Sequence, residues 1–192
     1  RAGFRRSHGL AYRPACPGCN ACVPVRIPVG ELVWSKTFRR IANRNVDLTV
    51  RDMAAHATIE QYRLFTRYQR SRHSGGEMST MGFRDFQAMV EDSPIDTRII
   101  EFRDDSEELV AVMLADQQAD ALSAVYSLFD PLMEKRSLGT YMVLWMVRRA
   151  EQLELPYVYL GYWIEESPKM AYKARFRPLE GLGPDGWKSV NS

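Results

Sequence analysis

The spacing of apolar residues predicts three helices in this chain. Apolar residues recur at helical spacing over residues 58–72, and Thr58 and Gln61 at the start form a capping-box pattern. Residues 83–92 show the same spacing over a shorter length, and residues 138–154 show it over a longer one. A long helix is therefore expected in each half of the chain.

The remaining apolar runs predict strands. An acidic turn at residues 104–108 joins two of them as a hairpin. The run at 157–163 is apolar on both faces, as in the central strand of a sheet. A meander that leads into a strand–helix–strand unit gives an α/β (α+β) fold, a mixed sheet flanked by helices. The predicted strands are 25–29, 47–51, 97–103, 109–115, 121–129 and 157–163.

Length and charge set the broad organisation. The 192 residues suit one domain with a small appendage, and we expect a cysteine-containing N-terminal segment at 1–50 and a main domain at 51–192. Net charge is only +2, so any nucleic-acid contact must come from local patches. Neither a transmembrane run nor a signal peptide is visible, so a cytoplasmic protein is expected. The first residue is Arg, which predicts further residues upstream.

The three cysteines of the chain form one Cys-x-x-Cys-x-x-Cys run, Cys16, Cys19 and Cys22. An odd, clustered set is a poor disulfide framework. The Pro-Gly turn inside the run lets thiolates converge on a zinc ion or an iron–sulfur cluster, with His8 or an upstream residue as the fourth ligand. A tight turn with reduced thiols is the alternative, and the pattern leaves both open.

Basic residues gather around aromatic ones over residues 36–51. Arg39, Arg40 and Arg44 are candidates for contact with a nucleic-acid backbone. The alternative is a solvated connector that leads into the strand at 47–51.

A second basic group ends the helix at 58–72. Arg72 and His73 precede Gly75 and Gly76, which stop the helix and permit a mobile loop that captures an anion. The alternative is simpler, because cations stabilise a helix C-terminus by about 0.3–1 kcal/mol without any ligand.

Residues 123–176 have a layout that acyltransferases use, namely strand, glycine-bearing turn, helix, strand and short helix. In the turn, Gly139 lets a ligand approach the backbone, and the helix N-terminus offers N–H groups to a phosphate, beside Arg136. An ordinary helix start capped by Ser137 is the alternative. Tyr141 stands where a small residue would suit coenzyme A, so its side chain is expected to crowd that cofactor's pyrophosphate.

Several motifs along the chain are shared with known proteins. They are Gly3-Phe4-Arg5-Arg6-Ser7, the segment from Tyr12 to Arg26 with its three cysteines, Tyr68-Gln69-x-Ser71-Arg72-His73, Leu122-Ser-Ala-Val-Tyr126, Asp130-Pro131, Arg136-Ser-Leu-Gly-Thr-Tyr141, the segment from Leu155 to Ile164, and Lys169-Met170-x-Tyr172-Lys173-x-x-Phe176-x-Pro178. In these motifs the chain resembles the bacterial aminoacyl-tRNA–protein transferases, the aspartate/glutamate leucyltransferases and the arginyl enzymes. The layout of 123–176 resembles the N-acyltransferase (GNAT) class.

The resemblance implies the reaction and its partners. An aminoacyl group moves from the 3′ end of a charged tRNA to the N-terminal amine of a protein that begins with Asp or Glu, which marks that protein for N-end-rule degradation. The chemistry needs no cofactor and no membrane. The attacking amine has an ordinary pKa of about 7.7–8.0, so it needs only mild assistance.

The implied reaction assigns a role to each candidate residue. Tyr126 and Tyr162 are expected to be catalytic, although packing in the core is the alternative for both. Lys169 and Lys173 are expected to bind the acidic N-terminus of the acceptor, although they also suit a solvated helix face. The full expected set is Tyr126 and Tyr162 for catalysis, Arg72, His73, Lys169 and Lys173 for the acidic N-terminus, and Arg136, Gly139, Tyr141, Arg39, Arg40 and Arg44 for tRNA.

Three hypotheses for the function follow. The first is tRNA-dependent transfer with leucine as the favoured donor, because an arginyl group would need a buried carboxylate and Glu165 and Glu166 are expected in an exposed turn. The second is a coenzyme A-dependent N-acetyltransferase, which Tyr141 and the basic segment argue against. The third is a non-enzymatic cysteine module that binds RNA or senses redox state.

Overall fold

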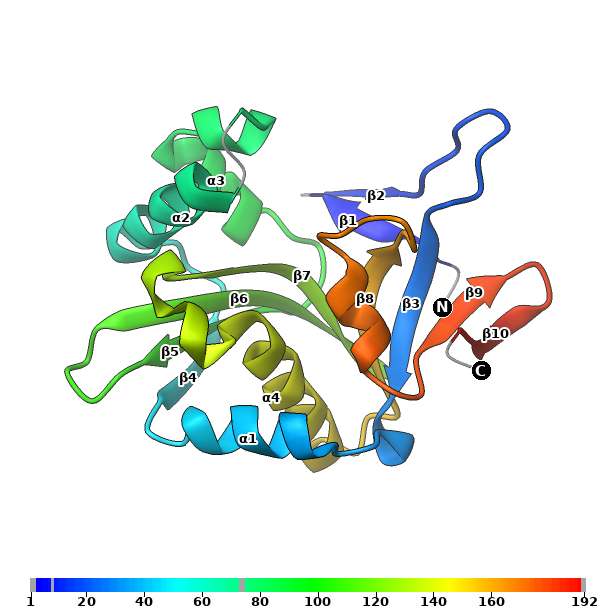
Figure 1. Cartoon of the computed structure of the whole chain (residues 1–192). Helices are drawn as coiled ribbons and strands as arrows, with labels where there is room; N and C mark the ends of the chain where they lie inside the picture. Colours follow the sequence, from blue (N-terminus) through cyan, green and yellow to red (C-terminus); the bar gives the residue numbers. More distant parts are fainter. Residues whose placement is uncertain (1–2, 8, 73–74, 191–192) are drawn as a thin grey trace.

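The computed structural model describes residues 3–7, 9–72 and 75–190. Eight strands form one mixed sheet in the order β10-β9-β3-β8-β7-β6-β5-β4 (Figure 1). Neighbouring strands are antiparallel except β7 and β8, which run parallel. The strands are β3 (Val23–Pro28), β4 (Thr49–Ala54), β5 (Thr97–Arg103), β6 (Leu109–Gln118), β7 (Ala121–Phe129), β8 (Tyr157–Trp163), β9 (Glu180–Gly183) and β10 (Gly186–Ser189).

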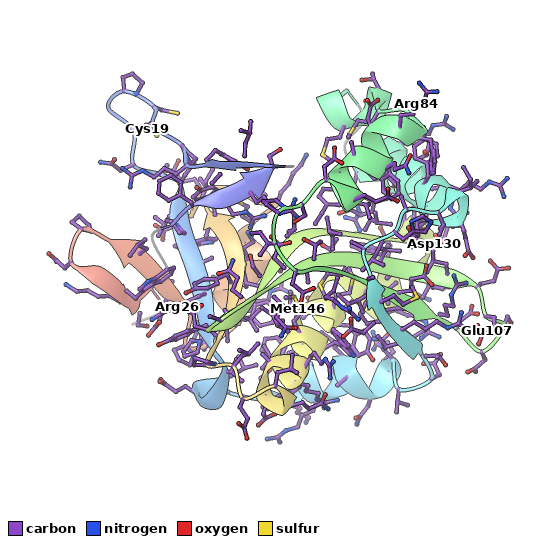
Figure 2. All side chains as sticks on the ribbon, turned by 180° about the vertical axis from the view of Figure 1, so that it is seen from behind. Cys19, Arg26, Arg84, Glu107, Asp130 and Met146 are labelled. Atoms are coloured by element: carbon purple, nitrogen blue, oxygen red, sulfur yellow. The ribbon has the colours of Figure 1, made fainter. Side chains whose placement is uncertain are left out.

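Helices cover both faces of the sheet. On one face, α1 (Lys36–Arg44) packs against α4 (Leu138–Gln152), and on the other lie α2 (Ile59–Arg72) and α3 (Phe83–Glu91) (Figure 1). Each layer has its own apolar core, with Phe38 and Met146 in the first and Phe65 and Phe86 in the second. Met146 lies at the centre of the molecule in Figure 2. The mixed α/β fold predicted from the sequence is confirmed.

Short elements complete the chain. A two-stranded sheet of β1 (Arg5–Ser7) and β2 (Leu10–Tyr12) lies beside the large sheet. The 3-10 helices are η1 (Val29–Glu31), η2 (Glu77–Thr80), η3 (Pro131–Arg136) and η4 (Ala171–Arg175). Within the described residues, no helix is long and apolar enough to cross a membrane.

The predicted helices and most strands are confirmed. The capping box at the start of α2 forms, because the Thr58 amide donates to Gln61 Oε1 at 2.9 Å and the Gln61 amide donates to Thr58 Oγ1 at 3.2 Å. Strands β5, β7 and β8 have the predicted bounds, whereas β6 extends three residues further, to Gln118.

Three local predictions are wrong. The segment after Ser35 is no solvated connector, because helix α1 begins there and buries Phe38 and Ile41. The short helix expected up to Phe176 is reduced to the 3-10 helix η4. The β9–β10 hairpin has no counterpart among the predicted elements.

The N-terminal segment predicted at 1–50 is built into the main fold. Strand β3 pairs with β8 on one side and β9 on the other, and α1 packs against α4. Among the described residues of that segment, 3–7 and 9–22 precede β3 and include the small sheet of β1 and β2.

The sheet opens between β7 and β8. These strands pair only where residues 121–123 face 157–159, near the start of both strands. Beyond that point each strand carries a bulge, because Val125 has no register partner on β6 and Leu160 has none on β3. Two central strands that diverge leave backbone and side chains accessible in the middle of the sheet. The candidate site lies at this opening.

Candidate functional site

A cleft of about 550 Å³ lies at the opening, on the α4 side of β7. Its walls come from α2, the end of β7, η3, the first turn of α4 and the η4 region. Three cations and one carboxylate line it, namely Arg72, Lys169, Arg175 and Glu134. Tyr68, Phe129 and Tyr172 supply aromatic surface. The cleft therefore suits an anionic ligand that also carries apolar or aromatic groups.

The first turn of α4 forms one wall of the cleft. Ser137 stands at the N-cap position in the left-handed conformation (φ 55°, ψ 42°), and its side chain caps no amide. Ser137 is therefore the N-cap residue, as the sequence alternative had it, but the N-terminus of this 15-residue helix borders the cleft without a side-chain cap. Gly139 also lines the cleft, and a Cβ there would lie 3.3 Å from the Phe129 ring. The glycine thus keeps this wall close to β7.

Two neighbours of Gly139 do not line the cleft. The Arg136 guanidinium makes two hydrogen bonds to Asp47, at 2.9 and 2.7 Å, and this pairing lowers the pKa of the Asp47 carboxyl. The Tyr141 side chain is buried, with its ring 5.8 Å from that of Phe102. The expectation that Tyr141 would crowd coenzyme A is therefore wrong, because the side chain packs in the core.

The predicted tRNA-contacting arginines lie on α1, outside the cleft lining. Arg39 and Arg40 are exposed. Arg44 donates to the Lys135 carbonyl and so ties α1 to η3. These positions extend a basic surface along the α1 side of the molecule and do not touch the opening itself.

The predicted acceptor-binding cations separate into different environments. Arg72 lies 3.6 Å from Glu134 and stacks over Phe129 at 5.7 Å, and Lys169 is exposed at the rim of the cleft. Lys173 is buried, so its assignment to a solvated face is wrong. Its Nζ donates to the Leu160 carbonyl at 2.8 Å and to the Tyr162 carbonyl at 2.6 Å. His73 lies outside the described residues.

Burial alters the protonation of Lys173. Loss of solvent and then the nearby charge of Arg5 lower its pKa from 10.5 to about 8. Its hydrogen bonds hold the bulge of β8, since Leu160 is the residue without a partner on β3.

The two predicted catalytic tyrosines lie on opposite sides of the opening. Tyr126 accepts a hydrogen bond from Gln69 Nε2, and burial raises its pKa well above its ordinary value, so the hydroxyl stays protonated. Tyr162 donates to the carbonyls of Gly3 (2.9 Å) and Tyr12 (3.2 Å), which ties it to the N-terminal segment. Neither tyrosine lines the 550 Å³ cleft.

The cysteine run forms an exposed turn. Cys16 and Cys19 are exposed and Cys22 is half-buried, and the Cys19 amide donates to the Cys16 carbonyl at 3.2 Å across Gly18. Figure 2 shows Cys19 on a loop that projects from the body of the molecule. No group of three His, Cys, Asp or Glu side chains in the described part of the chain is arranged to hold a metal ion. The described residues therefore do not form a closed metal site by themselves.

Arg5 is the principal site residue that the sequence did not single out. Its Nη2 donates to the carbonyl of the bulge residue Val125 at 3.0 Å. Its Nη1 lies over Gly161, where an added Cβ would be 1.7 Å away and where φ is +77°. Arg5 therefore crosses the gap between β7 and β8. Its place in a shared motif was the only sequence signal.

Models of one protein family match most of the chain. The model described as arginine-tRNA-protein transferase, C terminus, matches residues 60–183, and the one described as arginine-tRNA-protein transferase, N terminus, matches residues 1–40. The chain belongs to the arginine-tRNA-protein transferase family. The resemblance inferred from the sequence motifs is thereby confirmed.

Relatives of this family member are similar over almost its whole length. The aspartate/glutamate leucyltransferase of Paramagnetospirillum magneticum is 61% identical over 188 residues, which cover 98% of this chain and 77% of the relative. That of Gluconacetobacter diazotrophicus is 54% identical over 191 residues, which cover 100% of this chain and 74% of the relative. The chain thus spans about three quarters of these relatives.

Solved structures with low sequence identity share the fold. L-PGS from Bacillus licheniformis matches with a TM-score of 0.57 at 10% identity, over 74% of this chain and 45% of that one. The GCN5-related glucosamine N-acetyltransferase region of a fungal multi-domain β-N-acetylglucosaminidase matches with a TM-score of 0.50 at 10% identity, over 88% of this chain and 20% of that one. The GNAT-like architecture predicted for this family member is confirmed.

Proposed function

We propose that this protein transfers leucine from leucyl-tRNA to the N-terminal amine of proteins that begin with Asp or Glu, and so marks them for N-end-rule degradation. The single observation that carries the proposal is the cationic cleft beside the uncapped N-terminus of α4, at the opening between β7 and β8. Membership of the transferase family and the leucyltransferase names of relatives support it.

The cleft has the features that the 3′ end of a tRNA requires. The first-turn amides of α4 and the cations Arg72, Lys169 and Arg175 suit a phosphate. Tyr68 and Tyr172 offer rings on which a terminal base can stack. Arg39 and Arg40 extend the basic surface towards the body of the tRNA.

The lining of the cleft favours leucine over arginine as the transferred group. Glu134 is its one carboxylate among the described lining residues, and it is largely exposed (75%) and paired with Arg72. An arginyl side chain would need a buried, unpaired carboxylate. Phe129 and Met133 instead provide apolar surface for a leucyl side chain.

Chemically, the transfer exchanges an ester for an amide. The neutral amine of the acceptor attacks the ester carbonyl of leucyl-tRNA, a tetrahedral oxyanion forms, and the C–O bond to the ribose breaks. The amine loses a proton, and the ribose oxygen gains one as it leaves. Tyr126 is the candidate hydrogen-bond donor to the oxyanion, because its raised pKa keeps the hydroxyl protonated. Since Tyr126 lies outside the cleft lining, this role requires the ester carbonyl to lie at the bulge of β7 beside it.

One of the two sequence arguments against the coenzyme A hypothesis no longer holds. Because Tyr141 is buried, it does not exclude coenzyme A, and the remaining arguments are the family and the basic surface. The cysteine-module hypothesis predicts that changes at the cleft have no effect.

Transfer assays test these functions directly. The purified protein is incubated with labelled leucyl-tRNA, arginyl-tRNA or acetyl-CoA and a peptide with N-terminal Asp. Transfer of leucine alone is the expected result. Transfer of arginine alone would show that the donor assignment is wrong. Acylation by acetyl-CoA without any tRNA-dependent transfer would refute the proposed function.

A zinc ion or an iron–sulfur cluster at the cysteine run remains a separate proposal. All three thiols line one cavity beside Tyr162, but they are not arranged to hold a metal ion, so the proposal is supported by the Cys-x-x-Cys-x-x-Cys spacing alone. A further ligand must then come from outside the described set. Elemental analysis of the purified protein, before and after chelation, tests this proposal, and zinc or iron at less than about 0.1 equivalent would argue against it.

A further inference from the structure

Arg5 and Lys173 are two cations that approach the same gap in the sheet. Arg5 is bound to the carbonyl of the β7 bulge at Val125, and Lys173 to that of the β8 bulge at Leu160. Each therefore satisfies the backbone of one of the two diverging strands. This arrangement places two positive charges where the strands separate.

Neither cation has a carboxylate partner among the described residues. Asp116, which also lines the cavity beside Arg5, is the one carboxylate whose charge affects Arg5. Arg6 already binds both of its oxygens, at 3.0 and 2.9 Å, and Thr97 Oγ1 donates to it at 2.7 Å. Arg5 and Lys173 repel one another, and burial lowers the pKa of each. An anion between them would relieve this repulsion.

A cavity of about 270 Å³ lies beside Arg5. Ser123 and Val125 line it from β7, and Pro94 and Ile95 line it from the segment before β5. Its volume falls slightly below the range of about 300–1,000 Å³ for small-molecule sites, which suits one amino acid residue better than a cofactor. Val125 lines this cavity and Ser127, two residues further along β7, lines the 550 Å³ cleft. Val125 packs with the core under α2 and α3, and Phe129 of the cleft packs with the core under α4, so the two spaces meet β7 from opposite faces of the sheet, with the gap between β7 and β8 beside them.

The position of Arg5 is set by the contacts of the next residue, Arg6. The bidentate contact between Arg6 and the buried Asp116 attaches β1 to β6 of the large sheet. Gly161 leaves room for the guanidinium on the other side of the gap. Arg5 makes one hydrogen bond within the described structure, so most of its five N–H donors remain for a ligand.

We propose that Arg5 recognises the side-chain carboxylate of the acceptor's first residue, and that the 270 Å³ cavity receives this residue. This inference rests on the proposed function, in which the acceptor begins with Asp or Glu. Leucyl-tRNA in the larger cleft and the acceptor in the smaller one then meet at the bulge of β7. Arg5 acts as a specificity residue that contacts substrate, and Arg6 acts as a positioning residue.

The test compares two peptides that differ only in Asp or Asn at the N-terminus. With saturating leucyl-tRNA, Arg5→Met is expected to lower kcat/KM for the Asp peptide by roughly tenfold to a hundredfold, as for loss of a hydrogen bond to a charged group. The kcat/KM for the Asn peptide should stay within about twofold of that of the wild type, because this peptide has no carboxylate to accept the charged hydrogen bond. Because both peptides meet the same enzyme sample, the Asp-to-Asn ratio does not depend on the folded fraction.

Two further variants serve as controls for this test. Arg5→Lys is expected to retain part of the preference for Asp, and Arg84→Met, at an exposed site on α3 (Figure 2), to leave the ratio unchanged. Two results would overturn the proposal and assign Arg5 to an anion of the tRNA. One is an equal loss of kcat/KM for both peptides. The other is a higher KM for leucyl-tRNA with an unchanged ratio of kcat/KM between the Asp and Asn peptides.

Peptide binding without tRNA separates this inference from the proposed function. If the wild type transfers no leucine to either peptide, the proposed function fails. Fluorescence anisotropy with labelled Asp and Asn peptides then still tests Arg5. Tighter binding of the Asp peptide to the wild type than to Arg5→Met supports the inference, and equal binding of both peptides by the wild type refutes it.

Discussion

The basic side chains of α1 and those at the opening of the sheet differ in their exposure and in their hydrogen bonds. Arg39 and Arg40 on α1 are exposed, and neither forms an ion pair within the described residues. Lys173 is buried and makes two hydrogen bonds to backbone carbonyls, and Arg5 is partly buried and bound to a third. The first group can only add to a surface potential, whereas the second holds the geometry of a site. Substitutions should therefore divide into those that affect binding at a distance and those that affect folding and specificity.

Lys173→Met is expected to have the largest effect. The change leaves the buried carbonyls of Leu160 and Tyr162 without their donor, at a cost of about 2–4 kcal/mol in the free energy of unfolding. Leucine transfer should fall with it, because the bulge of β8 loses its support. Urea denaturation measures the stability, with the exposed Lys188→Met as the control. Equal stability of the two variants would contradict the structural role.

Arg136→Met comes next and separates a structural from a phosphate-binding role. Because the guanidinium is paired with Asp47, the change should lower the free energy of unfolding by about 1–3 kcal/mol. A double-mutant cycle with Asp47→Asn should give a coupling of about 1 kcal/mol. A large rise in KM for leucyl-tRNA with unchanged stability would instead place Arg136 in the tRNA site.

The stability contributed by Lys173 should depend on pH. Its pKa is about 8 in the folded protein and 10.5 ordinarily, so between these values the unfolded chain holds a proton that the folded chain has lost. Stability rises with pH wherever the unfolded state binds more protons. The difference in unfolding free energy between wild type and Lys173→Met should therefore grow from pH 8 towards pH 10. A difference that is constant across this interval would argue against a buried ammonium.

The double variant Arg39→Gln, Arg40→Gln should have the smallest effect. Exposed substitutions typically change stability by less than about 0.5 kcal/mol. If both residues contact tRNA phosphates, the slope of log affinity against log salt should decrease by roughly 1.4–1.8. Filter binding of leucyl-tRNA between low and moderate salt measures this slope. An unchanged slope would remove α1 from the tRNA surface.

Local sequence patterns predicted the elements that depend on local physics. The hairpin turn at 104–108, strand β8 and the capping box of α2 follow from spacing within a few residues. Helix α1 was missed because its buried residues, Phe38 and Ile41, are few among many basic ones. The β9–β10 hairpin was missed because its residues alternate weakly in polarity.

The candidate site was only partly predictable. The sequence assigned Gly139 to tRNA and Arg72 and Lys169 to the acceptor, and one cleft contains all three. It gave no means to foresee that Asp47 pairs with Arg136, because these residues lie 89 positions apart. The core packing of Tyr141 depends equally on its contact with Phe102 of β5.

The sequence by itself determined the element types, the acyltransferase layout of 123–176 and the family, because these reside in short motifs and in periodic patterns. The tertiary structure decided which cations are buried and what they face. Arg5 reaches Val125 across 120 positions, and the gap that it spans exists only because two bulged strands diverge. Burial and register between distant segments are properties of the assembled sheet. They decide which cations stay solvated and which ones form a specific site.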